Sequence, residues 1–442
     1  MKMDLSRRGF LRATAATGAT LGMGALTPSA LGGMAEAAAR RAYTGKFVVI
    51  GIPLSTPGRG YTKLLTTFQQ QHPGLSISYT SIPSERFVAL FSAAAASGEQ
   101  IDALLLNGQD VRRYALAGSI IPLDNLVSYR DRFQASSLTP YTVKGRLVAL
   151  PTGPVGGFPI GANTALLERI NKPYPATYAE LKQVGAALQK QGVAAFTHPG
   201  KNIYLWPVWF FTAFAQTTGN KSIQRTFDIL GGKGKFTDPD VVEALDLIFQ
   251  FSRDNLFSRD VLSIDTPGAQ TEFLTGRAAF WMGYGSATIA AVTPQVPHMK
   301  LAMKLMPRLV SNTSVVPQFP GGPGAAAAIY AKTTPQRRAM ALALFNDLTT
   351  DANDAYLVRD GQEALGVNKN APTSSAAVDQ QYKALIPRLT TYLDWYWPPE
   401  VNGAFQQGIQ AGVGGNQSAK QVAQTVQTVF EGLVVKGYKF AR

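Results

Sequence analysis

The chain has 442 residues, which predicts two or three domains, because a single hydrophobic core stops growing at about 250–300 residues. With 45% apolar and 16% charged residues, it has ample material for a core and is not composed like a disordered chain. The absence of cysteine excludes disulfides, thiolate metal sites and cysteine nucleophiles. The net charge of +14 would suit an anionic partner, but the basic residues are dispersed, and their tightest pairs stand at 112–113 and 337–338. We therefore interpret the charge as a solvated surface with a bias toward anionic ligands, and expect no nucleic-acid partner.

Catalytic and metal-binding motifs are missing from the sequence. His72, His198 and His298 are far apart, and none of them pairs at metal-ligand spacing. H-E-x-x-H, G-x-S-x-G and the phosphate-binding G-x-x-x-x-G-K-[ST] do not occur. We expect neither a metal nor a cofactor, and no catalytic residues.

The N-terminal segment resembles an export signal. "SRRGFLRA" places Arg7 and Arg8 before a moderately apolar stretch that reaches Leu31, and small residues allow cleavage near Ala37–Ala39. Residues 1–39 are predicted to be a twin-arginine signal peptide, and their removal leaves a net charge of +12. No other run of 18 apolar residues follows, so we expect a periplasmic protein that does not span the membrane.

The first part of the mature chain alternates between strand-like and helix-like segments. Apolar runs predict strands at 46–52, 75–80 and 101–107, and amphipathic patterns predict helices at 61–71, 84–98 and 110–118. This alternation predicts a doubly wound α/β unit with parallel strands, in which ligands bind at the carboxyl ends of the strands. The loops at that edge contain Arg59, Glu85, Asn107 and Asp110.

The rest of the chain is mainly helical. A segment rich in glycine and proline, 145–163, indicates a crossover between lobes. Capping residues and proline starts predict helices at 177–192, 237–255, 333–348 and 418–433. Two further segments, 301–307 and 318–331, are strand-like.

The tryptophans occur in three segments, "YLWPVWFF", "FWMGYG" and "YLDWYWPPE", each beside proline or glycine. Most tryptophans in proteins are core residues, and Trp209 fits that interpretation. The position of the others at loop–helix junctions favours contact with a ligand, because an indole face suits the C–H face of a sugar ring. On this basis the candidates are Trp206, Trp281, Tyr284, Trp395 and Trp397.

Several segments together resemble the bacterial extracellular solute-binding proteins of family 1, the sugar-capturing subunits of ABC importers. "IDALLLNGQDVRRYALAGSIIPLD" is similar to the aspartate-led strand and ligand loop of that family, and "YPATYAELKQVGAAL" to its P-x-T-[WY]-x-E-L element. "FLTGRAAFWMGYGSATI" resembles its F-x-x-G-x-A-A-M-x-x-x-G signature, with Phe280 in place of methionine. "PGGPGAAAAIYAKTTPQRRAMALALFNDLT" resembles its glycine-led return strand and the helix that follows.

The resemblance implies an α/β, two-lobed periplasmic-binding-protein fold of the type II kind, with discontinuous lobes joined by hinge crossings. Lobe 1 is expected to comprise 40–152 and 284–328, and lobe 2 to comprise 153–283 and 329–442. Maltodextrin-binding members have a cation before Gly-Tyr, as at Arg59, a carboxylate after the third strand, as at Asp110, and an aromatic-Pro pair, as at Trp206. The full predicted substrate-binding set is Arg59, Glu85, Asn107, Asp110, Trp206, Trp281, Tyr284, Gln318, Trp395 and Trp397.

The leading functional hypothesis is therefore a monomeric, non-enzymatic receptor that closes on a carbohydrate and delivers it to ABC permease transmembrane subunits. A second hypothesis keeps the fold but replaces the ligand with an anionic solute, such as a sugar phosphate, a phosphorylated polyol or a sugar acid. A third is a carbohydrate-active enzyme exported through the twin-arginine route.

Overall fold

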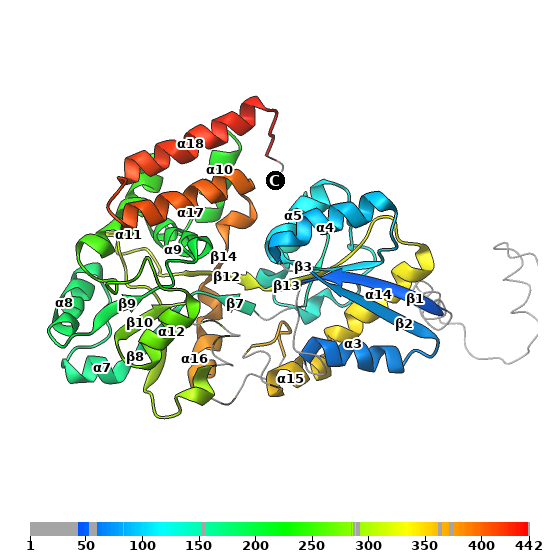
Figure 1. Ribbon diagram of the computed structural model, residues 1–442, viewed down its shortest axis with the longest axis horizontal. Helices are drawn as coiled ribbons and strands as arrows, with labels where there is room; N and C mark the ends of the chain where they lie inside the picture. The colour runs from blue at the N-terminus through cyan, green and yellow to red at the C-terminus, as the bar shows by residue number, and fades with distance from the viewer. Residues whose placement is uncertain are drawn as a thin grey trace, which may run out of the picture.

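The computed structural model describes residues 43–440 except 53–59, 83, 153–154, 284, 286–287, 289–291, 361–364, 371–374 and 376. These residues form two α/β lobes that lie side by side, with three short strands between them (Figure 1). Buried side chains form two large hydrophobic clusters, one centred on each lobe. The expected two-lobed α/β architecture is confirmed.

Lobe 1 is built on a five-stranded sheet with the order β2-β1-β3-β13-β6. Its strands are β1 (Gly45–Gly51), β2 (Leu75–Ser81), β3 (Ala103–Asn107), β6 (Leu150–Pro151) and β13 (Ala325–Ile329). The first three are parallel, as the strand–helix alternation predicts, and β13 inserts antiparallel beside β3. The helices that follow them are α3 (Gly60–Gln70), α4 (Ser84–Ser97) and α5 (Gly108–Leu116).

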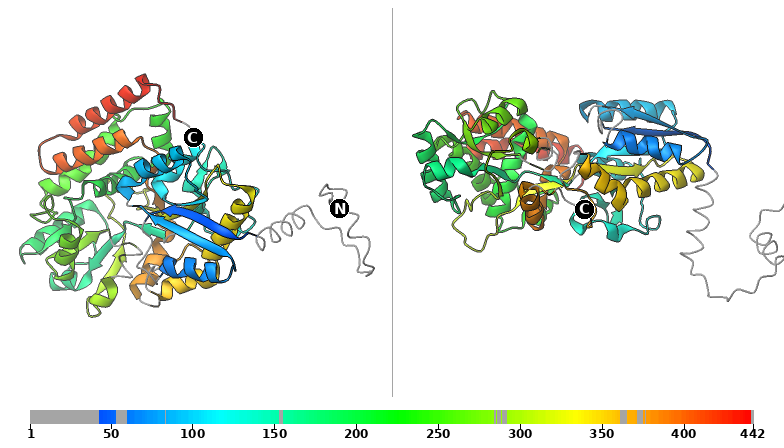
Figure 2. Two further views of the ribbon diagram at one scale, coloured as in Figure 1. Left: turned by 45° about the vertical axis from the view of Figure 1, so that its right-hand side comes forward. Right: turned by 90° about the horizontal axis from the view of Figure 1, so that it is seen from below.

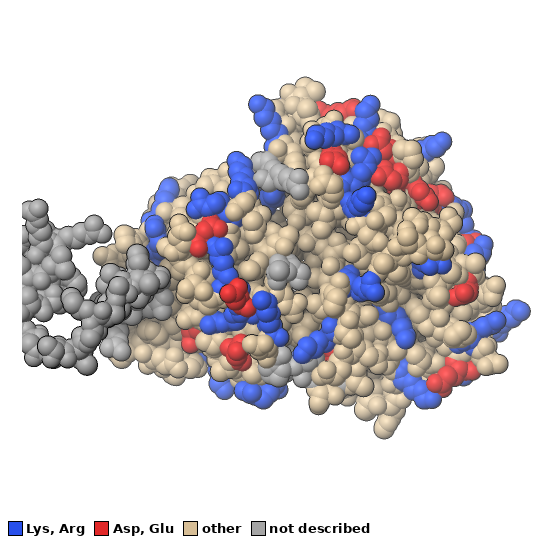
Figure 3. Space-filling view, turned by 180° about the vertical axis from the view of Figure 1, so that it is seen from behind, with Lys and Arg blue, Asp and Glu red and all other residues tan. Residues whose placement is uncertain are grey.

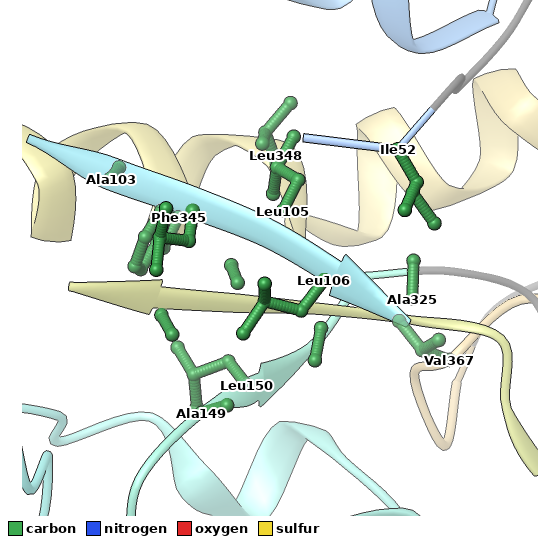
Figure 4. Packing of buried hydrophobic residues seen from close by; sticks show 14 of the residues in the cluster. Ile52, Ala103, Leu105, Leu106, Ala149, Leu150, Ala325, Phe345, Leu348 and Val367 are labelled. Atoms are coloured by element: carbon green, nitrogen blue, oxygen red, sulfur yellow. The ribbon is translucent and has the colours of Figure 1, made fainter. Parts of the chain in front are cut away.

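Two helices within the range 329–442, which the sequence analysis assigns to lobe 2, pack on lobe 1 instead. They are α14 (Pro335–Leu348) and α15 (Asp351–Arg359), and Phe345 and Leu348 of α14 lie beside Leu105 of β3 in the lobe 1 core (Figure 4). The assignment of 329–442 to lobe 2 therefore fails over this part. The sequence shows that α14 is apolar enough to be buried, but not which sheet it covers.

A buried carboxylate holds the start of α14 to lobe 1. Asp102 is fully buried at the start of β3, and its Oδ1 accepts hydrogen bonds from Thr333 Oγ1 at 2.8 Å and from Arg337 Nη1 at 2.9 Å. Its Oδ2 accepts from the backbone N–H of Val48 at 2.8 Å. A buried charge is tolerated only when it is paired in this way, so the Asp102–Arg337 pair specifies where α14 docks.

Lobe 2 contains a four-stranded sheet with the order β11-β8-β10-β9. Its strands are β8 (Ile160–Asn163), β9 (Ala194–Thr197), β10 (Ala278–Met282) and β11 (Leu301–Lys304). Its helices are α7 (Thr164–Arg169), α8 (Tyr178–Gln189), α9 (Pro207–Thr217), α10 (Ser222–Leu230), α11 (Pro239–Arg253), α12 (Thr266–Leu274), α17 (Pro399–Val413) and α18 (Ala419–Val435). We expected 284–328 in lobe 1, but β11 pairs antiparallel with β8, Leu301 opposite Asn163, and so belongs to lobe 2.

The hinge is a small sheet in which β12 (Phe319–Pro323) lies between β7 (Val155–Gly157) and β14 (Leu389–Thr391). Gly321 pairs with Gly157 on one side and with Thr391 on the other. A Cβ at Gly321 would lie 2.8 Å from the Cα of Gly157, so only glycine allows the strands to approach this closely. The helix α16 (Ala377–Leu385) lies next to this sheet. Lobe 1 also contains the short elements η1 (Arg130–Arg132), α6 (Ala135–Leu138), η2 (Thr139–Tyr141), β4 (Thr142–Val143) and β5 (Arg146–Leu147).

The predicted helix starts are largely confirmed. At α18, Ser418 and Gln421 form the complete capping box. Thr177 caps α8 through the N–H of Glu180, but the Glu180 carboxylate accepts from Ala176 and not from the cap residue. Asp238 occupies the N-cap position of α11 without capping it, because its carboxylate binds Arg225 and the N–H of Lys235.

Charged side chains are mixed on the surface. On the face shown in Figure 3, Lys and Arg side chains occur on both lobes and lie among Asp and Glu side chains. Within the described part of the chain, no helix has both the length and the apolar character needed to cross a membrane.

Candidate functional site

A cavity of about 410 Å³ lies between the lobes, beside the hinge. It is bounded by η2 of lobe 1, the start of α10 in lobe 2, and the hinge strand β14. Its lining residues are Thr139, Asn220, Lys221, Ser222, Ile223, Gln224, Gln318, Leu389, Thr390 and Thr391. Most of these carry hydroxyl or amide groups, which both donate and accept hydrogen bonds, and Lys221 is the single charged side chain among them. This lining suits a neutral ligand that carries many hydroxyl groups.

Gln318, one of the predicted binding residues, lies in the cavity wall. Its Oε1 accepts a hydrogen bond from Asn220 Nδ2 at 3.1 Å, and the same amide nitrogen donates to the carbonyl of Val316 at 2.7 Å. Asn220 adopts a positive φ of 68°, which asparagine tolerates better than most residues. The amide of Gln318 is thus held by lobe 2 at the point where β12 enters the hinge.

Trp395, in η6 (Leu393–Trp395), lies at the junction of the lobes. Its ring is stacked on Tyr141 of η2, with centroids 6.1 Å apart and planes at 15°, and it lies 5.2 Å from the ring of Tyr392. The indole also fills the space beside Gly108 of α5 and Gly322 of β12, where a Cβ would approach it to 2.6 and 2.7 Å. Trp395 is half-buried, so it joins lobe 1 to the hinge and still keeps part of its surface exposed.

Asn107 and Asp110 occupy the start of α5, near Trp395. Asn107 is the half-buried N-cap residue, and its side chain makes no capping hydrogen bond. Asp110 lies in the first turn and is only 7% exposed. Burial raises the pKa of the Asp110 carboxyl, and Arg113 acts in the opposite direction. Asp110 does not line the interlobe cavity, whereas Gln318 does.

Asp394 is a candidate that the sequence analysis missed. It precedes Trp395, and burial raises the pKa of its carboxyl to about 7, against the opposing effect of hydrogen bonds from Asn402 and backbone N–H groups. Asn402 Nδ2 lies 3.5 Å from Asp394 Oδ2, whereas Oδ1 of each residue is buried with no hydrogen-bond partner among the described residues. These two oxygens are buried and neither residue lines the interlobe cavity, so Asp394 is a buried titratable group beside the candidate site and not a part of its wall. The sequence signal was an acidic residue enclosed by aromatics, "YLDWYW".

Three predicted tryptophans are core residues in this structure. Trp206 is fully buried, its Nε1 donates to the carbonyl of Gly200 at 3.0 Å, and its ring packs 4.4 Å from that of His198. Trp281 is 2% exposed in β10, and Trp397, 7% exposed, stacks on Phe405 at 4.4 Å. None of the three presents its ring face to the interlobe cavity. The common pattern for tryptophan, burial in the core, explains these positions better than contact with a ligand does.

The exposed ring of the segment "YLWPVWFF" is Tyr204, not Trp206. Tyr204 lies in η3 (Ile203–Leu205), directly after the carboxyl end of β9 and in contact with α17, and 58% of its surface is exposed. A large aromatic ring that remains exposed at this edge of an α/β lobe is a candidate stacking surface. The sequence analysis predicted that Trp206, and not Tyr204, contacts a ligand. Sequence periodicity does not show which face of a short 3₁₀ turn is exposed to solvent.

The structure does not describe the side chains of the three remaining predicted residues. Arg59 and Tyr284 are outside the described residues. Glu85 is in the first turn of α4, and nothing is described of its side chain. Among the described residues, no three His, Asp or Glu side chains are grouped as a metal site would need.

A larger cavity, about 820 Å³, lies within lobe 2, and no residue of the hinge strands lines it. It opens beside Val193 and Arg277, at the amino ends of β9 and β10. In open α/β sheets ligands bind at the opposite, carboxyl edge. The interlobe cavity is therefore the better candidate site despite its smaller volume.

Comparison with solved structures shows which proteins share this fold. A chitin oligosaccharide binding protein is 18% identical, with a TM-score of 0.75, and the match covers 88% of this chain and 98% of that one. The GacH receptor of Streptomyces glaucescens, solved unliganded and with acarbose, is 16% identical, with a TM-score of 0.71 and coverage of 90% and 100%. The solute-binding protein RafE in complex with raffinose is 17% identical, with a TM-score of 0.67 and coverage of 88% and 100%.

Comparison with curated protein sequences gives no match. The profile of the family described as bacterial extracellular solute-binding protein matches residues 53–355, which is more than half of the chain. That region begins just after β1 and includes β2 and β3 of lobe 1, most of lobe 2, and the return of the chain through β12 and β13 to α14. The chain belongs to the bacterial extracellular solute-binding protein family.

Proposed function

We propose that the protein captures a carbohydrate between its two lobes and presents it to the transmembrane subunits of an ABC importer. The observation that carries this proposal is the interlobe cavity, whose walls come from both lobes and the hinge and consist mainly of hydroxyl and amide groups. A ligand that contacts both lobes binds one arrangement of them better than any other. It therefore shifts the hinge equilibrium toward that arrangement, and a permease can read this shift.

Partly exposed aromatic rings support a sugar rather than another polar ligand. Trp395 lies at the junction of the lobes, and Tyr204 exposes its ring on lobe 2. The C–H face of a pyranose stacks on such rings, while its hydroxyl groups need fixed hydrogen-bond partners, such as Gln318 in the cavity wall. The solved structures of similar fold include complexes with acarbose and with raffinose, which is consistent with this ligand class.

A screen of melting temperature against mono-, di- and oligosaccharides, polyols and sugar phosphates tests the proposal. A ligand at 100 times its dissociation constant adds about 2.7 kcal/mol of stability, which is readily detected. We expect one class of neutral sugars to raise the melting temperature of the mature protein. If no neutral sugar does so, the proposal is wrong.

One observation favours the anionic alternative. Lys221 is the single charged residue in the cavity wall, and the chain carries a net charge of +14. A response to sugar phosphates that Lys221→Gln abolishes, without any response to neutral sugars, would establish an anionic ligand in the same cavity.

We also propose export through the twin-arginine route, with cleavage near Ala37–Ala39 and a monomeric protein in the periplasm. Residues 1–39 lie outside the described structure, so this proposal rests on Arg7, Arg8 and the apolar stretch after them. Replacement of both arginines by lysine should leave the uncleaved precursor in the cytoplasm. Normal processing of that variant would exclude the route.

A further inference from the structure

Arg112 of α5 crosses from lobe 1 to aromatic rings of lobe 2. Its guanidinium carbon lies 5.7 Å from the ring centroid of Tyr396 and 5.2 Å from that of Phe440. Tyr396 and Phe440 both pack with lobe 2, and the red trace that follows α18 runs from lobe 2 toward lobe 1 (Figures 1 and 2). One cation thus contacts two rings across the interlobe boundary.

The two rings are held on lobe 2 by further aromatic contacts. Phe227 of α10 lies 4.9 Å from Tyr396 in an edge-on arrangement and 5.5 Å from Phe440. Tyr438 packs 5.9 Å from Phe430 of α18. We call residues 436–440, which follow α18 and carry Tyr438 and Phe440, the C-terminal strap.

The environment of Arg112 makes the rings its main partners. The residue is half-buried, and burial lowers the pKa of its guanidinium. Its Nη2 is buried without a hydrogen-bond partner, and no described carboxylate forms an ion pair with Arg112. A desolvated cation gains more from an aromatic face than an exposed cation does. Arg113, the next residue, is exposed and provides a natural comparison.

The contact lies next to the interlobe cavity. The first turn of α10 supplies Ser222, Ile223 and Gln224 to the cavity wall, and Phe227 stands one turn further along the same helix. Because α10 is rigid over this length, a movement of lobe 1 away from the strap also moves it away from the cavity wall. The interlobe arrangement that Arg112 holds is therefore the arrangement in which the cavity exists.

We propose that Arg112 and the C-terminal strap form a latch that holds the two lobes at the angle seen here. Arg112 is a positioning residue in this latch, because it acts through the strap and does not line the interlobe cavity. Without the latch, the lobes separate on this side of the hinge. The consequence for ligand capture rests on the function proposed above, since a smaller population of the competent arrangement weakens the apparent affinity in proportion.

The distance between the lobes can be measured without any ligand, so this test is independent of the proposed function. The chain has no cysteine, so Thr66→Cys in α3 and Gln183→Cys in α8, both at exposed positions, can be spin-labelled selectively in the full mature protein. Arg112→Gln and, separately, Phe440→Ala should lengthen and broaden the interlobe distance distribution. One desolvated cation–π contact predicts a fall of about fivefold in the ratio of latched to unlatched molecules.

Two further variants identify the role of the charge. Arg112→Lys retains a cation over the rings and should keep the original distance distribution, and Arg113→Gln on the same helix should do the same. If Arg112→Gln fails to fold, Phe440→Ala decides the question alone, because Phe440 lies outside both lobe sheets. An unchanged distance in Arg112→Gln and Phe440→Ala would overturn the latch, as would lengthening in Arg113→Gln to the same extent.

Discussion

The indole of Trp395 lies directly against Gly108, so closely that a Cβ on Gly108 would be 2.6 Å from ring atoms Cη2 and Cζ2. Gly108 is the first residue of α5 in lobe 1, and Trp395 precedes the return of the chain into α17 of lobe 2. The absence of a side chain at Gly108 is therefore what allows the lobes to meet at this point. The same ring covers Gly322 of the hinge strand β12, so Trp395 is fixed against two glycines from different elements.

Replacement of Gly108 by alanine should disturb this junction. The added methyl group meets a rigid ring that is also stacked on Tyr141, so Trp395 must shift and separate from α5. We expect sugar affinity to fall by tenfold or more, equivalent to about 1.4 kcal/mol, measured by isothermal titration with the sugar found in the melting screen. Gly432→Ala is the matched control, because a Cβ at Gly432 of α18 has no neighbour within 4 Å. Equal affinity in the two variants would show that the contact has no role in binding.

Removal of the Trp206 side chain should affect stability rather than ligand binding. The ring is fully buried between His198 and Phe257, and its Nε1 satisfies the carbonyl of Gly200. Trp206→Ala should lower the free energy of unfolding by about 3–5 kcal/mol, as large-to-small core substitutions do. Urea denaturation followed by circular dichroism measures this loss. A variant with unchanged stability and weakened sugar binding would show that Trp206 contacts the ligand.

Tyr204 should show the opposite behaviour, because most of its surface is exposed. Tyr204→Ala is expected to change the free energy of unfolding by less than about 0.5 kcal/mol and to weaken sugar binding by about 1–2 kcal/mol. Tyr204→Phe keeps the stacking face and should retain most of the affinity. Titration calorimetry of both variants distinguishes stacking on the ring from hydrogen bonding by its hydroxyl. Full sugar affinity in Tyr204→Ala would show that Tyr204 does not contact the ligand.

Asp394 should make stability depend on pH. Its pKa is raised to about 7, whereas an unfolded aspartate titrates near 4, so between these values the folded state holds a proton that the unfolded state has lost. The contribution of Asp394 to stability should therefore fall as the pH rises from about 4 to 7, by up to about 1.4 kcal/mol per pH unit, and level off above 7. The amide in Asp394→Asn cannot ionise, so this variant should lose that slope and exceed the wild type in melting temperature at pH 8.

A second buried carboxyl must be separated from this effect. Burial also raises the pKa of Asp354, to about 6, although it accepts hydrogen bonds from the N–H groups of Val367 and Asn368. Its contribution has the same sign but ends near pH 6. Burial lowers the pKa of His198 to about 3, so His198 contributes in the opposite direction up to about pH 6.5. The difference in slope between the wild type and Asp394→Asn from pH 6 to 7.5 therefore isolates Asp394. If Asp394→Asn retains the wild-type slope in that interval, the raised pKa is not responsible for it.

The local structure could be predicted well from the sequence. The three parallel strands of lobe 1 and the helices between them appear within a few residues of their predicted bounds, because short-range apolar periodicity and capping residues such as Ser418 and Gln421 specify them. The placement of α14 and β11 could not be predicted in this way. Each is apolar enough to be buried, and the choice of lobe depends on partners distant in sequence, such as Asp102 for Arg337.

The candidate site was predicted in part. Gln318 lines the interlobe cavity and Trp395 lies at the lobe junction, but Trp206, Trp281 and Trp397 are enclosed by core side chains. Proline and glycine in the sequence show that an aromatic residue lies at the end of a helix or strand. They do not show whether its ring is buried in the core or exposed to solvent. Tyr204 and Trp206 are two residues apart in one short turn, and their exposures are 58% and 0%.

The sequence by itself determined the family, the α/β alternation, the helix caps and the absence of cysteine, since each depends on residue type and on spacing within about twenty positions. The tertiary structure alone decided which rings are exposed, which lobe each late element joins, and how Arg112 meets Phe440 across 328 positions of the chain. Those outcomes follow from packing and desolvation between segments far apart in sequence, and such interactions act only when the chain is folded.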